Sequence, residues 1–304
     1  MSDGRLTGEV LKGRYALGAL YGAGGTAEVY QAFDVGSDRK VAIKLFRGTA
    51  TREDEIRLGR EAHVLTKLWR SGMVAVHDTG SFRGSPFLVM QAVEGGTLRR
   101  WTREPRAPER VAWIGAQVAE VLAHVHRHDV VHRDVKPSNI LLDRDGRRAY
   151  LTDFGLALQA HATRVTRSGV VVGTPGYLAP EQVRGDEVTP AADVFALGLV
   201  LLECLTGRSE YPGGDTGSAL ARLHRGPVIP DDLPTPWREL LTAMTGLSAR
   251  RRPTAADCVA GLAAASGIAF GGAAANDDER FAVTRRARTG WIPAHPDRRA
   301  VHRE

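Results

Sequence analysis

Polar side chains are dense in one short stretch of the chain, His132–Asn139, which reads HRDVKPSN. Within it, Asp134 and Lys136 are separated by a single residue that can turn inward. A carboxylate placed there can accept a hydroxyl proton, while an ammonium beside it neutralises a transferred phosphoryl group. The spacing therefore indicates group-transfer chemistry.

Two short apolar segments follow this stretch and return the chain to it. Ile140–Leu142 and Ala149–Leu151 predict a hairpin with a tight turn between its strands. Because paired strands lie about 5 Å apart, we expect Asn139 and Asp153 to converge at its open end. An amide oxygen and a carboxylate suit Mg²⁺ that is shared with phosphates. An aspartate that only caps a turn is the simpler interpretation of either aspartate alone, but not of the whole set.

A glycine-rich loop near the start of the chain is the second phosphate-binding signal. Gly22, Gly24 and Gly25 lie between two predicted strands. Glycine lets backbone N–H groups approach phosphate oxygens that a side chain would obstruct. A plain hairpin turn would also use glycine. A dinucleotide-type loop is excluded, because a strand and not a helix follows.

Lysine is scarce, with five residues among 41 basic ones, so each position is informative. Strand alternation puts Ala42 and Lys44 on one face, where the small side chain leaves room for a flat ring and the ammonium reaches phosphates. A buried Lys needs a carboxylate partner, and we expect Glu61 on the following helix. A surface Lys with a snorkelling stem is the alternative.

The elements that must position these residues divide into two groups. The first has one charged helical stretch, Arg52–Leu68, and ends where Glu94-Gly95-Gly96 breaks the pattern as a hinge. Its apolar runs predict a five-stranded antiparallel sheet: Tyr15–Leu20, Val29–Phe33, Val41–Phe46, Val74–His77 and Pro86–Val93.

The second group is helical. Helical spacing or helix-forming composition is found in Glu109–Arg127, Ala191–Leu205, Trp237–Leu247 and Ala255–Ala265. The pattern predicts an α+β fold with a small β lobe at about 11–92, a larger helical lobe at about 97–266 and a cleft between them. Together they form one domain, 11–266, which a Gly/Ala linker and an Arg-rich tail follow at 267–304.

Composition excludes several classes of protein. With 304 residues, 43% hydrophobic and 25% charged, the chain is ordinary globular material. No apolar run approaches the roughly 18–20 residues of a membrane span, and the start lacks the apolar core of a secretion signal. Two cysteines suit a reducing cytoplasm, where we expect the protein. The net charge of +6 comes mostly from the tail after Arg280, so we expect no nucleic-acid partner.

In this order, the motifs resemble the eukaryotic-like serine/threonine protein kinases of bacteria over roughly Leu11–Ala265. The resemblance implies the bilobal kinase fold, with ATP as phosphoryl donor, Mg²⁺ (or Mn²⁺) as metal and Ser or Thr of proteins as acceptor. It implies that Asp134 is the base, that Lys136 supports the γ-phosphate, and that Lys44, paired to Glu61, contacts the other phosphates.

The remaining implied roles concern the metal, the nucleotide and the substrate. Asn139 and Asp153 would hold the metal, and the glycine loop would cover the phosphates. The adenine would lie among residues of both lobes and the hinge: Val29, Ala42, Met90, Gln91, Val93 and Leu141. Residues 173–181 resemble a peptide-docking segment in which Thr174 favours Ser/Thr acceptors. Glu181 would pair with Arg252, and Asp193 would hold the backbone beside His132.

Regulation is also implied by the resemblance. Arg133, which directly precedes Asp134, would bind a phosphate on the activation segment. Thr163, Thr166 and Ser168 are the candidate sites, and we expect autophosphorylation at Thr166 or Ser168, with dimerisation left open as its route. An unmodified polar loop is the alternative.

Two other interpretations are weaker. A catalytically silent scaffold of the same fold would normally lack Lys44, Asp134 or Asp153, and all three are present. A small-molecule phosphotransferase would need no peptide-docking segment like residues 173–181.

Overall fold

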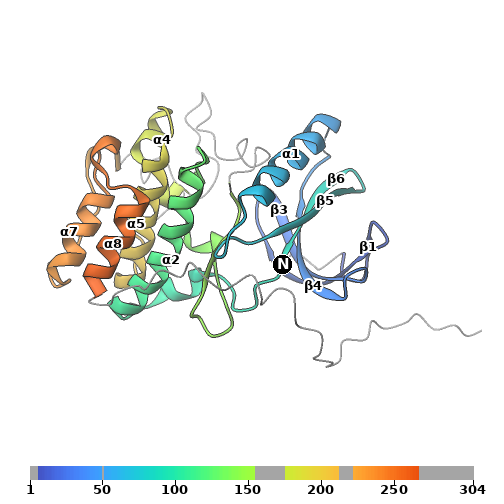
Figure 1. Ribbon diagram of the computed structural model, residues 1–304, viewed down its shortest axis with the longest axis horizontal. Helices are drawn as coiled ribbons and strands as arrows, with labels where there is room; N and C mark the ends of the chain where they lie inside the picture. The colour runs from blue at the N-terminus through green and yellow to red at the C-terminus, as the bar shows by residue number, and fades with distance from the viewer. Residues whose placement is uncertain (1–5, 50, 155–174, 212–221, 267–304) are drawn as a thin grey trace, which may run out of the picture.

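The computed structural model describes residues 6–49, 51–154, 175–211 and 222–266. Figure 1 shows a β-rich part that carries helix α1 beside a larger part made of helices. This is the α+β arrangement that the sequence predicts.

The β-rich part is one antiparallel sheet of six strands in the order β1-β2-β3-β4-β6-β5. Its strands are β1 (Val10–Leu11), β2 (Tyr15–Ala23), β3 (Ala27–Asp34), β4 (Arg39–Phe46), β5 (Val76–Phe82) and β6 (Ser85–Gln91). The sequence predicts five strands, because two residues in β1 are too few to display alternation. Residues 41–46 of β4 are all buried, since the sheet is covered on both faces at this strand.

Helix α1 (Arg52–Leu68) has the bounds that the sequence predicts. It begins with a capping box, in which Thr51 Oγ1 accepts from the Asp54 amide at 3.2 Å and Asp54 Oδ2 accepts from the Thr51 amide at 3.0 Å. Leu58 and Ala62 are its buried residues, and they pack with Leu88 of β6. The helix is thereby fixed on the face of the sheet that borders the second lobe.

The helical part is built around α5 (Pro190–Thr206), in which residues 192–205 are all buried. Around it lie α2 (Pro108–His126), α4 (Pro180–Arg184), α7 (Thr235–Met244) and α8 (Ala255–Ser266). A Cβ at Gly115 of α2 would lie 2.7 Å from Leu201 Cδ2, so glycine lets α2 approach α5 closely. The four predicted helices are confirmed within a few residues. The shift is largest for α7, which ends at Met244 rather than at Leu247.

A two-stranded hairpin of β7 (Ile140–Leu142) and β8 (Ala149–Leu151) lies where the two parts meet. On one side, the Gly95 amide donates to Leu142 O at 3.0 Å and the Leu142 amide donates to Gly96 O at 2.8 Å. On the other side, the Leu151 amide donates to Gly72 O at 2.8 Å. The hairpin is therefore bonded both to the hinge between the lobes and to the turn between α1 and β5, which fixes the residues at its open end relative to the sheet.

Candidate active site

The open end of the hairpin brings Asn139 next to Asp153. The register pairs Ile140 with Leu151, and beyond this pair the Thr152 amide donates to Asn139 O at 3.0 Å. The convergence expected from the sequence is thus confirmed at the backbone. Asp153 itself has a positive φ of 63°, a backbone conformation uncommon for a residue other than glycine.

The carboxylate of Asp134 is held by two donors. Its Oδ2 accepts from Asn139 Nδ2 at 2.9 Å and lies 2.8 Å from Lys136 Nζ. Asn139 Nδ2 also donates to the Asp134 carbonyl at 2.8 Å, so one amide fixes both the backbone and the side chain of this residue. The Asp134 side chain is therefore fixed in orientation by contacts within its own loop.

Lys44 reaches this end of the hairpin from β4. Its Nζ lies 2.8 Å from Asp153 Oδ1, and the residue is only 4% exposed. We expected Glu61 as the carboxylate partner, but the ion pair that the structure gives Lys44 is with Asp153. The Lys44 and Asp153 side chains are 5% and 20% exposed, so the pair lets both charges be held largely away from water.

Glu61 lies instead at the edge of α1. It lines a cavity of about 280 Å³ together with Val64, Val131 and Phe154. Phe154 is buried and also packs beneath α1 against Leu65. Whether Glu61 can pair with Lys44 therefore depends on the position of α1 over the end of the hairpin. Helical periodicity alone does not determine that position.

The loop that carries Asp134 is fixed by Asp193 of α5. Asp193 Oδ2 accepts from the His132 amide and Oδ1 from the Arg133 amide, both at 2.7 Å, as the resemblance implies. Arg133 has a φ of 67° and an exposed side chain. His126 Nε2 of α2 also lies 2.8 Å from Asp193 Oδ2, a contact the sequence analysis missed because nothing in the spacing of α2 marks this residue.

A second contact ties this loop to the hairpin. His132 is fully buried, with Nε2 2.9 Å from Thr152 O, and its ring packs at 4.7 Å from that of Phe154. The loop, the hairpin end and α5 are thus joined by hydrogen bonds. A catalytic group at Asp134 would be held rigidly by this arrangement.

The predicted adenine-site residues gather at the face of the sheet that borders the hairpin. Ala42 pairs with Met90 and Val29 with Lys44, and Ala42 and Met90 are buried. Val93 and Leu141 pack on the apolar cluster that contains Met90. The Gln91 amide donates to Ala75 O at 2.8 Å and is therefore already engaged within the chain.

Neither backbone conformation nor packing within the described residues requires glycine in the glycine loop. Gly22, Gly24 and Gly25 all lack positive φ values. A Cβ built at Gly22 or Gly25 would meet nothing within 4 Å, and one at Gly24 would make only an ordinary contact of 3.7 Å with Ala27 O. Their absence of side chains therefore leaves space for a group outside the chain.

Asn139 and Asp153 fit a divalent metal such as Mg²⁺. Asn139 uses its amide nitrogen toward Asp134, so the amide oxygen is the atom left for a ligand. In the described ranges, no group of three or more His, Cys, Asp or Glu side chains forms a closed metal site. Mg²⁺ is commonly bound by one or two carboxylates and completed by phosphate oxygens and water.

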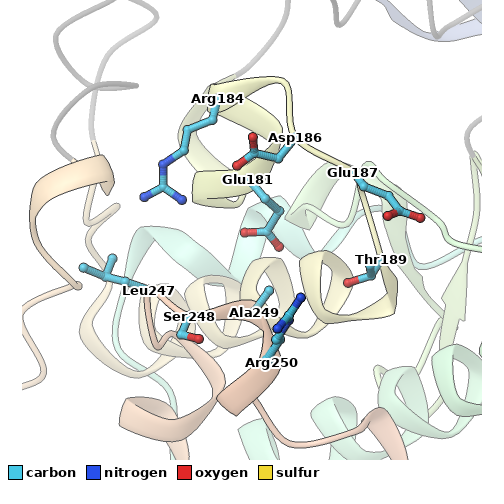
Figure 2. Close-up of a pocket in the computed structure, with 9 residues that line it drawn as sticks. All are labelled: Glu181, Arg184, Asp186, Glu187, Thr189, Leu247, Ser248, Ala249 and Arg250. Carbon is cyan, nitrogen blue, oxygen red and sulfur yellow. The ribbon is translucent and has the colours of Figure 1, made fainter.

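Glu181 and Arg252 form a buried bidentate ion pair, as the resemblance implies. Arg252 NH1 lies 2.6 Å from Glu181 Oε1 and NH2 lies 2.9 Å from Oε2. Figure 2 shows Glu181 directed from α4 toward the turn that carries Arg250, beside a pocket of about 450 Å³. The pair joins the end of the docking segment to the C-terminal helices.

Four predicted site residues lie outside the described part of the chain: Thr163, Thr166, Ser168 and Thr174. Within the described ranges, no helix has both the length and the apolar character that a bilayer crossing requires.

Residues 15–261 match the family model of the protein kinase domain. Serine/threonine-protein kinase PknL of Mycobacterium tuberculosis is 38% identical over 249 residues, which are 79% of this chain and 62% of that protein. PrkC of Bacillus subtilis is 39% identical over 72% of this chain and 34% of its own length. The DNA damage-responsive kinase RqkA of Deinococcus radiodurans is 38% identical over 84% of this chain and 40% of its own length. In each case the match spans less than two thirds of the relative.

Proposed function

The chain belongs to the protein kinase family, and on that premise we propose that it transfers the γ-phosphoryl group of ATP to Ser and Thr hydroxyls of proteins. The main supporting observation is that two contacting sets of side chains, Lys44 with Asp153 and Asp134 with Asn139 and Lys136, lie at one end of the hairpin. The Thr152 amide, which donates to Asn139 O at 3.0 Å, links the two sets. Two ammonium groups, an amide and two carboxylates are groups that phosphoryl transfer can use.

Each group has a distinct proposed role. Asp134 accepts the proton of the acceptor hydroxyl as it attacks phosphorus, and Lys136 beside it neutralises charge on the transferred group. Lys44 binds the other phosphates of ATP, and Glu61 is its proposed partner when α1 moves toward β4. Asn139 and Asp153 hold Mg²⁺, with Mn²⁺ as an alternative, and this metal would neutralise phosphate charge.

The nucleotide itself is proposed to bind between the lobes. Gly22, Gly24 and Gly25 leave space for its phosphates. The adenine is placed against the residues of the sheet, the hinge and β7 described above: Val29, Ala42, Met90, Gln91, Val93 and Leu141. The domain is proposed to extend over 11–266, with 267–304 as linker and tail.

Thr174 is proposed to contact the acceptor residue, and Arg133 to bind a phosphate added at Thr166 or Ser168, with Thr163 as the further candidate. The exposed Arg133 side chain beside the catalytic loop supports this role. The cytoplasm is the proposed location, supported by two buried cysteines that are free thiols.

One assay tests the proposal. The full chain is incubated with labelled ATP, Mg²⁺ and a generic basic acceptor protein, and phosphate on Ser and Thr is mapped by mass spectrometry. We expect transfer to the acceptor and phosphate on Thr166 or Ser168. Asp134→Asn is expected to lower the rate at least about 100-fold. Asp129→Asn, an exposed change in the preceding turn, is the matched control.

Two results would count against the proposal. Transfer by Asp134→Asn at the wild-type rate would remove Asp134 as the base. An active enzyme whose segment 155–174 carries no phosphate would refute the autophosphorylation sites while leaving the transfer itself in place.

A further inference from the structure

A buried carboxylate of α5 lies directly behind the proposed peptide-docking segment. Glu203 is 4% exposed, and its Oε2 accepts a hydrogen bond from the hydroxyl of Tyr177. Tyr177 belongs to residues 173–181, in the 3₁₀ turn η3 (Pro175–Tyr177). Burial, reinforced by Glu203, raises the pKa of the Tyr177 phenol above its ordinary value, so the phenol stays a neutral donor.

The charge of Glu203 is balanced by an arginine from another element. Arg99 NH1 lies 3.0 Å from Glu203 Oε1, and its guanidinium lies 5.6 Å from the centre of the Tyr177 ring. Arg99 belongs to η1 (Leu98–Arg103), which contacts both α5 and η2 (Pro137–Asn139) of the catalytic loop. The Arg99 side chain is 40% exposed, so it forms part of the surface where the docking segment meets the catalytic loop.

Two further carboxylates near this segment are also paired within the chain. Glu181 is paired with Arg252, and Glu210 Oε1 lies 2.5 Å from Arg225 NH1. The neighbouring Tyr211 lies beside Gly176 of the docking segment. Glu203, Glu181 and Glu210 thus each already have an arginine of the chain as partner.

We propose that Arg99 is a specificity-determining residue for the protein substrate. It occupies Glu203, so a substrate Arg or Lys cannot use that carboxylate, and it presents its own positive charge to the bound segment. The substrates are therefore Ser/Thr segments with a neutral or acidic side chain, and not a basic one, facing Arg99. The inference rests on the proposed function, because it assigns the substrate class of that same site.

Arg99 occupies the place at Glu203 that a cation of the substrate would otherwise take. A hydrogen-bonded ion pair with a buried carboxylate would favour a basic substrate if the carboxylate lacked its internal partner. While Arg99 is present, its guanidinium repels a second cation that approaches Glu203. Removing Arg99 should therefore create a preference for basic peptides that the wild-type protein lacks.

The experiment compares peptides that share one acceptor Ser or Thr. In each series, Arg, Gln or Glu is placed in turn at every position flanking the acceptor, and kcat and KM are measured separately. The wild-type protein is expected to use Glu and Gln peptides at least as well as Arg peptides at every position. Arg99→Gln and Arg99→Met should raise kcat/KM for an Arg peptide about tenfold at one position, mainly through KM.

Arg100→Gln is the matched control, because it removes the same charge from the next residue of η1, which is exposed. Its peptide profile should equal that of the wild-type protein. Adding Glu203→Gln to Arg99→Gln should abolish the gained preference, which a merely structural role of Arg99 would not explain.

The outcomes separate the two proposals. If the wild-type protein transfers phosphate with a strong preference for Arg peptides, the proposed role of Arg99 is wrong. This result does not require that any Arg99 variant folds. An unchanged profile in Arg99→Gln and Arg99→Met also overturns it, while the proposed function stands. If the wild-type protein transfers no phosphate to any peptide or protein, the proposed function and this inference both fail.

Discussion

The ammonium of Lys44 and the carboxylate of Asp153 form an ion pair between the sheet and the hairpin, with Nζ 2.8 Å from Oδ1. The two residues come from different lobes, so the pair links strand β4 to the residue that follows β8 by two positions. Each side chain compensates the charge of the other in a cleft where an uncompensated charge would be costly.

Lys44→Met is expected to lower kcat/KM for ATP at least about 100-fold, because the variant removes the cation that would meet phosphate oxygens. The chain should still fold, since Met has a similar length and Asp153 retains partial access to water. Steady-state kinetics and thermal unfolding check both statements. Lys67→Met, an exposed lysine of α1, is the control, and equal activity of the two variants would contradict the role of Lys44.

Two glycines should respond in opposite ways to the same added methyl group. A Cβ at Gly22 would meet nothing within 4 Å, so we expect the Tm of Gly22→Ala to lie within about 2 °C of wild type. Its KM for ATP should rise about fivefold or more, because a phosphate is proposed to need that space. Gly95 is in the hinge, and Gly95→Ala puts a Cβ 1.9 Å from Asp143 O. This change should lower the free energy of unfolding by about 2–4 kcal/mol.

Urea unfolding and nucleotide titration distinguish these two effects. A destabilised Gly22→Ala protein would mean that the loop needs its glycine for folding. A Gly95→Ala protein of wild-type stability would mean that the hinge is free to move away from β7.

The buried pair of Glu181 and Arg252 should contribute to stability and not to chemistry. Arg252→Gln leaves Glu181 without its bidentate partner and frees Gly246 O and Ala191 O from their donors. We expect a loss of about 3–5 kcal/mol in the free energy of unfolding. Arg250→Gln, at the exposed rim of the pocket in Figure 2, should change it by less than about 0.5 kcal/mol. Equal effects of the two changes would show that the Glu181 pair adds little.

Much of this architecture could be predicted from local pattern. The hairpin follows from its two short apolar segments and helix α1 from its charged helical stretch, because each depends on residues close in sequence. The clamp by Asp193 was implied by the family resemblance. The partner of Lys44 could not be predicted in the same way. We expected Glu61, and the carboxylate that pairs with Lys44 depends on how α1 is seated over the hairpin.

The same limit applies to other long-range pairs. Arg99 with Glu203 and His126 with Asp193 join elements far apart in the chain, and no periodicity marks one Arg or His among many. Strand β1 was missed for a different reason, because its two residues are ordered by pairing with β2 and not by their own pattern.

The stability of the sheet should depend on pH through Asp34. Its carboxylate is buried and accepts from Arg14 Nε at 2.6 Å, from Arg14 NH2 at 2.8 Å and from the Gly36 amide at 3.0 Å. The Arg14 hydrogen bonds are the main cause that holds the pKa of this carboxyl well below its ordinary value. Because the folded pKa is depressed, the stabilisation is complete above the unfolded pKa of about 4 and is lost as pH falls below it.

Asp34→Asn should therefore reduce the free energy of unfolding by about 2–4 kcal/mol at pH 7, with a difference from wild type that shrinks as the pH falls below about 4. Urea unfolding at a series of pH values measures this difference. Asp38→Asn removes an exposed carboxylate of the same turn and should cost less than about 0.5 kcal/mol at neutral pH. If the Asp34→Asn deficit were the same at pH 3 as at pH 7, the ionised Asp34 could not be its source, and shape rather than charge would explain the contact with Arg14.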